Sequence, residues 1–290
     1  MQKILSIAAA GLILFGLNSC TKNKSNSTGG NPFSNGTTVI VDPTPTGIPV
    51  GTVPGAFTKK AVLEEFTGEW CGWCPEGAAI MDAAIAANPN TVIGVGVHDG
   101  DPMELPAFNS YIKGLTGVTG FPNGSVQRAK ATGRGSWMGQ ITTALGQTAN
   151  CGLAMVTKST GNSLDVDVYI GYNAAITSST NLTVYLTEDD VPQSSPGAQG
   201  NYSSTVVVDP NTWTHGHVLR AVLTANPGDV VTLNSTDKYT KVSFKGIDLS
   251  QYTFSNIANV HVVAFVNDNT GNRDILNAQQ ATLNEIKKWD

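Results

Sequence analysis

Two cysteines, Cys71 and Cys74, lie three residues apart where a strand pattern passes into a helical pattern. The apolar run 61–66 predicts a strand, and the alanine-rich run 76–87 predicts an amphipathic helix. Pro75 suits the first turn of that helix, because proline fixes the backbone angle φ and lacks an N–H that a first turn leaves unbonded anyway. The sequence therefore predicts a strand, a turn and a helix, with both cysteines at the start of the helix.

This position predicts reactive thiols. The unbonded N–H groups and the positive dipole end of a helix N-terminus stabilise a thiolate, and they lower a cysteine pKa from about 8.5 to between roughly 3.5 and 7.5. Only the thiolate attacks a disulfide. We therefore expect a redox dithiol in which Cys71 is the more exposed and more acidic thiol and Cys74 is shielded one helical turn further in.

The run Trp70-Cys71-Gly72-Trp73-Cys74 resembles the active-site motif of thioredoxins. About fifty residues later, Gly120-Phe121-Pro122 is similar to the thioredoxin segment that carries a cis-proline. The resemblance implies a thioredoxin-like α/β domain in which Pro122 follows a cis peptide bond and packs beside the dithiol. Glu65 falls where thioredoxins keep a buried acid. Trp73 departs from the family, which has proline there, so reduction potential and choice of partner are not implied.

Glu65 also has a role that the strand pattern itself suggests. The strand 61–66 is expected in the middle of a mostly parallel sheet, buried on both faces, with Glu64 and Glu65 pointing to opposite faces. At least one of these carboxyl groups should lose contact with water, which raises its pKa. If that group is Glu65, it can take a proton from Cys74 as a general base. The alternative is that both glutamates lie in solvent near the end of the strand.

The front of the chain resembles a bacterial export signal. The apolar run 4–17 is shorter than the roughly 20 residues of a membrane span. Leu17-Asn18-Ser19-Cys20 resembles a lipobox, which implies a signal peptide over 1–19 and lipidation of Cys20. Ordinary cleavage beside an incidental cysteine is the alternative. Thr21 follows Cys20, which by resemblance to Gram-negative lipoproteins favours a lipid-anchored protein of the outer membrane, at its periplasmic face or at the cell surface.

Composition divides the rest of the chain into three parts. Residues 20–56 are dominated by Ser, Thr, Asn, Gly and Pro, which predicts a flexible tether. Residues 57–149 alternate strand and helix patterns, which predicts an α/β domain whose mostly parallel sheet is covered on both faces. Residues 150–290 show short strands between turn residues, which predicts an all-β sandwich. The expected elements of the α/β part are strands 61–66 and 92–98 and helices 76–87, 106–115 and 137–148.

Four short motifs occur in order at 64–68, 186–190, 215–220 and 263–266. Together they resemble the twenty-eight-kilodalton outer membrane protein family, which consists of lipoproteins of Bacteroidota-type bacteria. The resemblance spans most of the mature chain. It implies a thioredoxin-like domain followed by an Ig-like sandwich, and it implies no particular enzymatic activity.

The remaining polar and sulfur-containing residues suggest no cofactor. Cys151 is expected to be a buried small hydrophobe at a strand start, with a redox role as the alternative. His215 and His217 would share one face of a strand and could form a metal pair, but no third ligand is near, so structural hydrogen bonding is expected. His98 would be the candidate partner if the cysteines bound copper. Asp99, Asp101 and Glu104 follow the end of a strand and could coordinate calcium, but an exposed acidic loop is expected.

Two functions remain from the sequence. The first is a thiol-disulfide oxidoreductase, oxidase-like or isomerase-like because a reductase would need electrons from the inner membrane. The second is a binding or adhesion protein that uses both domains as a platform for proteins or glycans. Expected partners are envelope proteins, through thiol exchange or surface binding. Nucleic acid is not expected, since the 290-residue chain has a net charge of -5 and no basic cluster.

Overall fold

The computed structural model describes residues 38–42 (backbone only), 49–173, 179–202, 206–207, 209–232, 238–269 and 273–290. The predicted signal peptide, Cys20 and most of the predicted tether lie outside the described residues. Among the described residues, no helix is both long and apolar enough to span a membrane.

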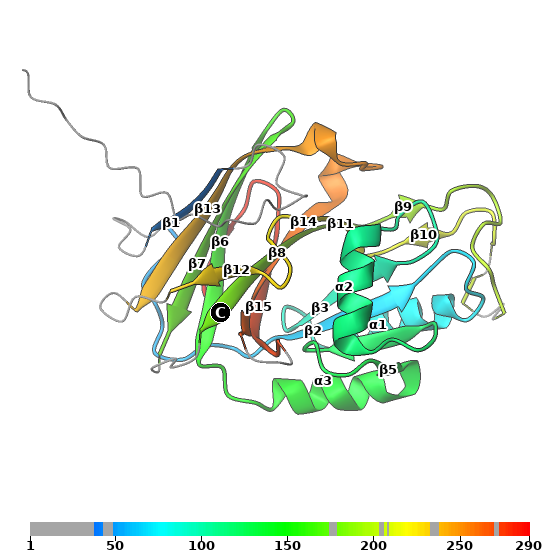
Figure 1. The fold of residues 1–290 in the computed structure, drawn as a ribbon, viewed down its shortest axis with the longest axis horizontal. Coiled ribbons are helices and arrows are strands. Elements are labelled where there is room, and N and C mark those ends of the chain that lie inside the picture. The colour runs from blue at the N-terminus through cyan, green and yellow to red at the C-terminus, as the bar shows by residue number, and fades with distance from the viewer. Residues whose placement is uncertain are drawn as a thin grey trace, which may run out of the picture. The chain divides into compact units, whose positions relative to one another are not determined.

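Three helices and two parallel strands form the part around the cysteines. Strands β2 (Ala61–Thr67) and β3 (Val92–His98) are parallel neighbours, and every residue of both is buried. Helices α1 (Cys74–Ala87) and α3 (Trp137–Leu145) pack together on one face of these strands, and α2 (Pro106–Thr116) covers the other (Figure 1). The elements predicted from the sequence are therefore confirmed, with boundary shifts of a few residues.

The sheet itself is mixed, so the prediction of a mostly parallel sheet was wrong. Its strand order is β15-β14-β8-β11-β3-β2-β4-β5, with β12 paired to β8. Only β2 with β3 and β3 with β11 are parallel, and the other pairs are antiparallel. The further strands are β4 (Asn123–Val126), β5 (Thr132–Gly133), β8 (Thr180–Glu188), β11 (Val218–Val222), β12 (Asp229–Val231), β14 (Val260–Asp268) and β15 (Ile275–Thr282).

A second sheet, in the order β1-β13-β7-β6-β16, lies against the β8, β11 and β14 part of the first sheet (Figure 1). An apolar core fills the space between them, with inward residues such as Val166, Phe244 and Val262 fully buried. The strands are β1 (Thr38–Asp42), β6 (Cys151–Thr160), β7 (Ser163–Tyr172), β13 (Tyr239–Asp248) and β16 (Ile286–Lys287). A separate short pair joins β9 (Val191–Pro192) to β10 (Thr214–His215). Short 3-10 turns occur at Arg134–Ser136, Leu249–Gln251 and Ile257–Asn259.

Part of the predicted tether belongs to the folded unit. Strand β1 pairs antiparallel with β13. Val50 is buried, and the Trp289 indole N–H donates to the Gly51 carbonyl at 2.9 Å. The tether prediction therefore needs correction for these segments. Composition did not reveal that these segments are folded, because an edge strand needs only backbone hydrogen-bond partners and a few apolar contacts.

The first sheet crosses the predicted boundary between residues 149 and 150. Strand β3, from the α/β part, pairs directly with β11, from the all-β part. The buried Arg128 guanidinium likewise contacts Glu64 on β2 and Tyr185 on β8. The described residues from 38 to 290 belong to one compact unit. The two halves share a sheet and a core, and the division into two domains between residues 149 and 150 stays a prediction.

Candidate functional site

Cys71 and Cys74 form a disulfide, with 2.05 Å between their Sγ atoms and 5.4 Å between their Cα atoms. Helix α1 begins at Cys74, with Pro75 in its first turn. Cys71 lies in the turn before the helix, where its N–H donates to the Gly68 carbonyl at 2.9 Å. The pairing of the two cysteines is therefore as expected, while Cys71 precedes the helix start.

Both cysteines are buried, although the tryptophan that precedes each of them is exposed. Cys71 is 5% exposed and Cys74 2%, whereas Trp70 is 54% and Trp73 46% exposed. The Trp70 ring meets Phe121 edge-on at 5.1 Å between centroids, and its indole N–H donates to the Asp99 carbonyl. Cys71 is therefore only slightly more exposed than Cys74.

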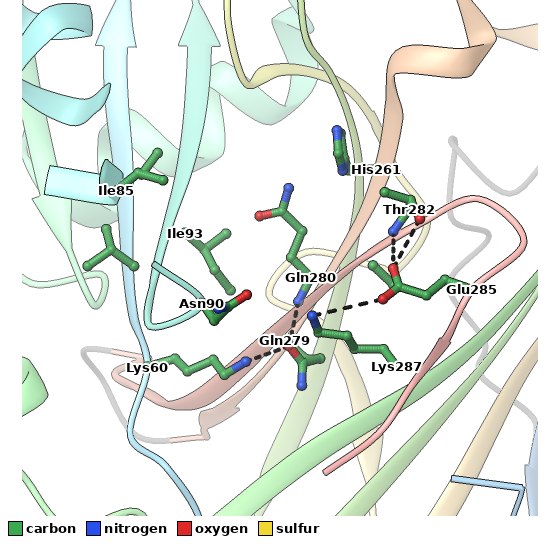
Figure 2. A pocket seen from close by; sticks show the side chains of 12 residues that line it. Lys60, Ile85, Asn90, Ile93, His261, Gln279, Gln280, Thr282, Glu285 and Lys287 are labelled. Carbon is green, nitrogen blue, oxygen red and sulfur yellow. Dashed lines mark hydrogen bonds and ion pairs between the residues drawn. The ribbon is translucent and has the colours of Figure 1, made fainter. Parts of the chain in front are cut away.

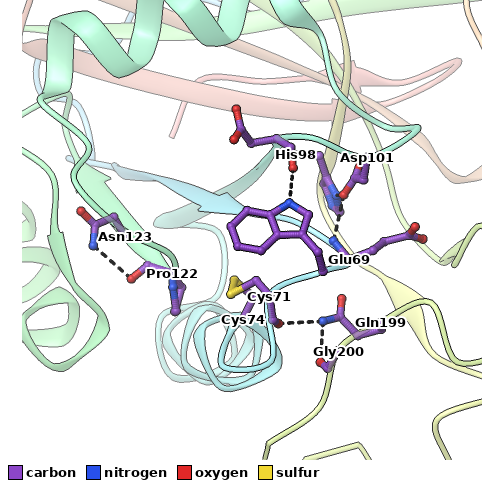
Figure 3. The surroundings of a disulfide bond; sticks show 11 residues. Glu69, Cys71, Cys74, His98, Asp101, Pro122, Asn123, Gln199 and Gly200 are labelled. Carbon is purple, nitrogen blue, oxygen red and sulfur yellow. Dashed lines mark hydrogen bonds and ion pairs between the residues drawn. A yellow bond between two sulfur atoms is a disulfide. The ribbon is translucent and has the colours of Figure 1, made fainter.

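The predicted cis-proline is present beside the disulfide. The Phe121–Pro122 peptide bond is cis, and Pro122 lies in the surroundings of the disulfide (Figure 3). A Cβ on Gly77, one turn along α1 from Cys74, would come within 3.0 Å of the Pro122 Cβ. Pro122 is thus packed against the first turns of α1.

Glu65 lies under the same helix turn. Its side chain is fully buried, and its Oε1 atom has no hydrogen-bond partner among the described residues. Burial, and then the charge of Asp82, raises the pKa of Glu65 well above its usual value, while His217 acts in the opposite direction. The Glu65 Oε1 atom lies so close to Gly77 that no side chain fits between them. The expectation that at least one glutamate of this strand is desolvated is confirmed for both, since Glu64 is also fully buried.

Gly77→Ala should therefore destabilise the fold by about 1–3 kcal/mol, because the new methyl group meets Glu65 and Pro122. Glycine to alanine in an exposed helix normally stabilises by up to about 1 kcal/mol. Gly139→Ala in α3 is the matched control, since open space surrounds Gly139. Urea unfolding should move the two midpoints in opposite directions, and a stabilised Gly77→Ala variant would contradict this packing.

His215 and His217 contact different clusters and do not form the metal pair that the sequence left open. The His217 Nδ1 atom is 3.1 Å from Asp189, and its Nε2 atom is 3.4 Å from Asp82 on α1. His215 instead meets the His98 ring edge-on at 4.8 Å between centroids. Among the described residues, no group of three histidine, cysteine or acidic side chains could hold a metal ion.

The two histidines differ in charge. Burial alone would lower the pKa of His217, but Asp189 and Asp82 outweigh it and raise that pKa to about 9. Burial, together with the neighbouring His98, lowers the pKa of His215 to about 3. His217 is therefore a cation at neutral pH, and His215 is neutral.

His217→Asn should remove a pH-dependent part of the stability. The folded pKa of His217 is raised from 6.5 to about 9, so its contribution is complete below pH 6.5 and is lost as the pH rises through 9. We expect a loss of about 2 kcal/mol at pH 6.5, allowing for screening of the exposed Asp82, and little loss at pH 9.5. Urea unfolding at both pH values measures this. Equal losses at the two pH values would contradict the assignment.

A buried polar cluster holds the turn before Cys71, and the sequence did not predict it. The Asp101 carboxylate accepts from the His98 ring at 2.6 Å and from the backbone N–H of Glu69 at 3.0 Å and of Met103 at 2.8 Å. Burial raises the pKa of Asp101, but these hydrogen bonds outweigh it and lower that pKa. The Asp101 side chain is 3% exposed, so the expectation of an exposed acidic loop was wrong for it. Its partners come from separate elements, which composition cannot reveal.

Cys151 is the first residue of β6 and is fully buried. Burial raises the pKa of its thiol to about 12. The expectation of a buried small hydrophobe is confirmed.

A cavity of about 320 Å³ lies between the α1–β3 connection and β15 (Figure 2). Polar side chains in its wall already have hydrogen-bond partners. The Lys60 ammonium donates to Gln279 at 2.6 Å and to Asp290, and the Glu285 carboxylate accepts from the Thr282 hydroxyl. His261, on the same wall, pairs with Asp189 at 3.1 Å. The cysteines take no part in this cavity.

Comparison with known protein families identifies the family to which the chain belongs. The family described as outer membrane protein Omp28 matches residues 109–287, which is more than half of the 290 residues. The chain belongs to the Omp28 family. This confirms the resemblance seen in the four sequence motifs, and it places this family member in the outer membrane. No curated protein matches the sequence significantly.

Solved structures agree with the fold of this family member. HBP35 of Porphyromonas gingivalis is 23% identical, with a TM-score of 0.68 over 81% of this chain and 78% of that one. Protein AGR_C_4864 from Agrobacterium tumefaciens is 15% identical, with a TM-score of 0.52 over 80% of this chain and 98% of that one. At these identities the likeness shows a shared fold alone.

Proposed function

We propose that this outer membrane protein is a thiol-disulfide oxidoreductase that acts in the oxidising or isomerising direction on envelope proteins. One observation carries the proposal: the Cys71–Cys74 disulfide lies at the start of α1, and the buried carboxyl group of Glu65 lies against Gly77, one helical turn from Cys74. The family match supports the location and says nothing of the activity.

The proposed reaction has two displacement steps. A substrate thiolate attacks the Cys71 sulfur, the bond between Cys71 and Cys74 breaks, and Cys74 leaves as a thiolate. A second substrate thiolate then attacks the substrate sulfur of the mixed disulfide and releases the Cys71 thiolate. The substrate loses two electrons and gains a disulfide, while the protein becomes a dithiol. A disulfide-containing partner must re-oxidise it before the next cycle.

Glu65 is proposed to handle the proton of Cys74. Burial raises the pKa of Glu65 and so favours its protonated form, which can protonate the departing Cys74 thiolate. In the reverse direction the carboxylate accepts the proton from the Cys74 thiol. Its contact with Gly77 supports this role, because Gly77 lies one helical turn from Cys74. Pro122 is proposed to pack beside the disulfide and help position the substrate.

The finer architecture and the anchor are also proposals. Residues 57–149 would form a thioredoxin-like domain and residues 150–290 an Ig-like sandwich, and the parallel β2–β3 pair and the two facing sheets support these assignments. Cys20 would carry the lipid anchor after removal of residues 1–19. The outer membrane location supports this anchor, and mass spectrometry of the mature N-terminus tests it: an unmodified residue there would rule it out.

The purified, oxidised protein should form a disulfide in a peptide that contains two cysteines, with one equivalent of peptide oxidised per Cys71–Cys74 disulfide reduced. Glu65→Gln should slow this reaction by on the order of tenfold or more, because the amide cannot transfer the proton. Glu76→Gln is the matched control on α1, since Glu76 pairs with Arg134 near the surface. Stopped-flow mixing with mass analysis measures both rates. No transfer of oxidation to the peptide would refute the proposal.

A binding platform remains the second candidate, and one observation favours it. Trp70, Trp73 and Tyr202 are 54%, 46% and 70% exposed; the two tryptophans precede the two cysteines in the sequence, and the Tyr202 ring contacts Trp73. Exposed aromatic clusters are common in binding surfaces. A protein that binds partners through this cluster without exchanging disulfides would retain binding when both cysteines are replaced by serine.

A further inference from the structure

We propose that residues 193–202, here called the strap, decide which thiol compounds reach Cys71, with Gln199 and Tyr202 as the specificity-determining residues. The strap belongs to the all-β half of the chain, follows β9, and lies against the turn that carries Cys71. The inference rests on the proposed function, because it concerns the same disulfide. It adds the class of substrate: extended polypeptide segments that contain cysteine.

Glu69 holds the strap at two places. Its carboxylate accepts from the Ser194 backbone N–H at 2.6 Å and from the Ser194 hydroxyl at 2.5 Å. Its backbone carbonyl accepts from the Gly200 N–H at 2.5 Å. Glu69 is 4% exposed, so these are protected hydrogen bonds two residues before Cys71.

The next contacts fall on Cys71 itself and on the residue after it. The Gln199 side-chain amide donates to the Cys71 carbonyl at 3.0 Å and to the Gly200 carbonyl at 2.8 Å (Figure 3). The Tyr202 backbone N–H donates to the Gly72 carbonyl at 2.8 Å. Gln199 is 3% exposed. The strap is therefore hydrogen-bonded along the whole turn from 69 to 72.

Two glycines allow this close approach. A Cβ on Gly72 would strike the Tyr202 ring at 2.5 Å, and a Cβ on Gly200 would be 3.0 Å from the Trp70 carbonyl oxygen. The Tyr202 ring also meets Trp73 edge-on at 5.4 Å between centroids. The close approach of the strap to this turn accounts for the burial of Cys71, which is 5% exposed although the two tryptophans of the turn are about half exposed.

The hydrogen-bond pattern indicates what can replace the strap. Gly200 and Tyr202 offer alternate backbone N–H groups to carbonyl oxygens, as an extended edge segment does. An extended peptide presents the same donors and can take the place of the strap while its cysteine approaches Cys71. A folded protein presents few unpaired N–H groups, since its backbone groups are already bonded. The strap therefore favours extended substrates over folded ones.

The test compares reduction of the Cys71–Cys74 disulfide in the purified full chain by three probes: dithiothreitol, a short unstructured peptide with two thiols, and reduced thioredoxin as a folded dithiol. In the wild type, reduced thioredoxin should be much slower than the peptide. Tyr202→Ala and Gln199→Ala should each raise the rate with reduced thioredoxin, relative to dithiothreitol, by on the order of five- to tenfold. Loss of one or two hydrogen bonds or an aromatic contact weakens the strap by that factor.

Ile286→Ala is the control, because Ile286 is 54% exposed on β16, a strand that pairs with β6. Tyr202 is 70% exposed, so its replacement tests the strap even if Gln199→Ala fails to fold. Relative rates that stay unchanged in the Tyr202 variant would overturn the inference. A protein that shows the strap effect while Cys74→Ser traps no envelope protein on Cys71 in cells would refute the proposed function alone, since reduction by these probes requires no physiological partner.

Discussion

Arg128→Ala should destabilise the protein by about 3–5 kcal/mol, which is a large part of the stability of a typical domain. The Arg128 and Glu64 side chains are 1% and 0% exposed, and their closest charged atoms are 3.6 Å apart. Arg128 also donates to the Tyr185 hydroxyl at 2.6 Å, and its guanidinium lies 4.7 Å from the centre of the Phe265 ring. Removing Arg128 leaves the Glu64 carboxylate buried without its cation.

Urea unfolding followed by tryptophan fluorescence measures this loss. Arg134→Ala is the matched control, because Arg134 pairs with Glu76 at a partly exposed site and should cost at most about 1 kcal/mol. The double variant Arg128→Met with Glu64→Gln should recover part of the lost stability, since it removes both charges together. Similar losses for Arg128→Ala and Arg134→Ala would show that the buried contacts of Arg128 contribute little to stability.

The same unfolding curve bears on the two halves of the chain. Glu64 and Arg128 come from the part before residue 150, and Tyr185 and Phe265 come from the part after it. If Arg128→Ala lowers the stability of both halves together, the unfolding curve should show one cooperative transition. Two transitions, with only the first shifted, would instead support separately folding domains.

The helices and most strands could be predicted from the sequence because they depend on local patterns. The run that forms β3 is continuously apolar, as a strand buried on both faces requires. Helix α1 follows from its alanines and from Pro75 at its start. The placement of the cysteines and of Pro122 followed from motifs in which a few residues carry most of the information.

What could not be predicted depends on contacts between distant segments. Strand β11 pairs with β3 across more than 100 residues, and no local pattern specifies a strand's neighbour. Asp101 resembles an exposed acid in sequence, yet it is buried because His98 and two backbone N–H groups satisfy it. Gln199 lies in a stretch of small polar residues that resembles an ordinary loop, although its side chain bonds the backbone of Cys71.

Cys74→Ser should produce the largest change in chemistry. In this variant the Cys71 thiolate can still attack a partner's disulfide, but no Cys74 thiolate is present to displace the partner from the mixed disulfide. Mixed disulfides that are short-lived in the wild type should therefore accumulate. Cys71→Ser lacks the proposed attacking thiol, so few adducts should form in it.

The most direct test of the oxidoreductase account is the amount of partner protein trapped on Cys71 in the cell envelope. Cells that produce Cys74→Ser are quenched with acid, and adducts are separated without reductant and identified by mass spectrometry. We predict at least tenfold more Cys71-linked adducts in Cys74→Ser than in the wild type or in Cys71→Ser, all of them lost on reduction. Equal and low levels of adducts in all three strains would contradict disulfide exchange through Cys71.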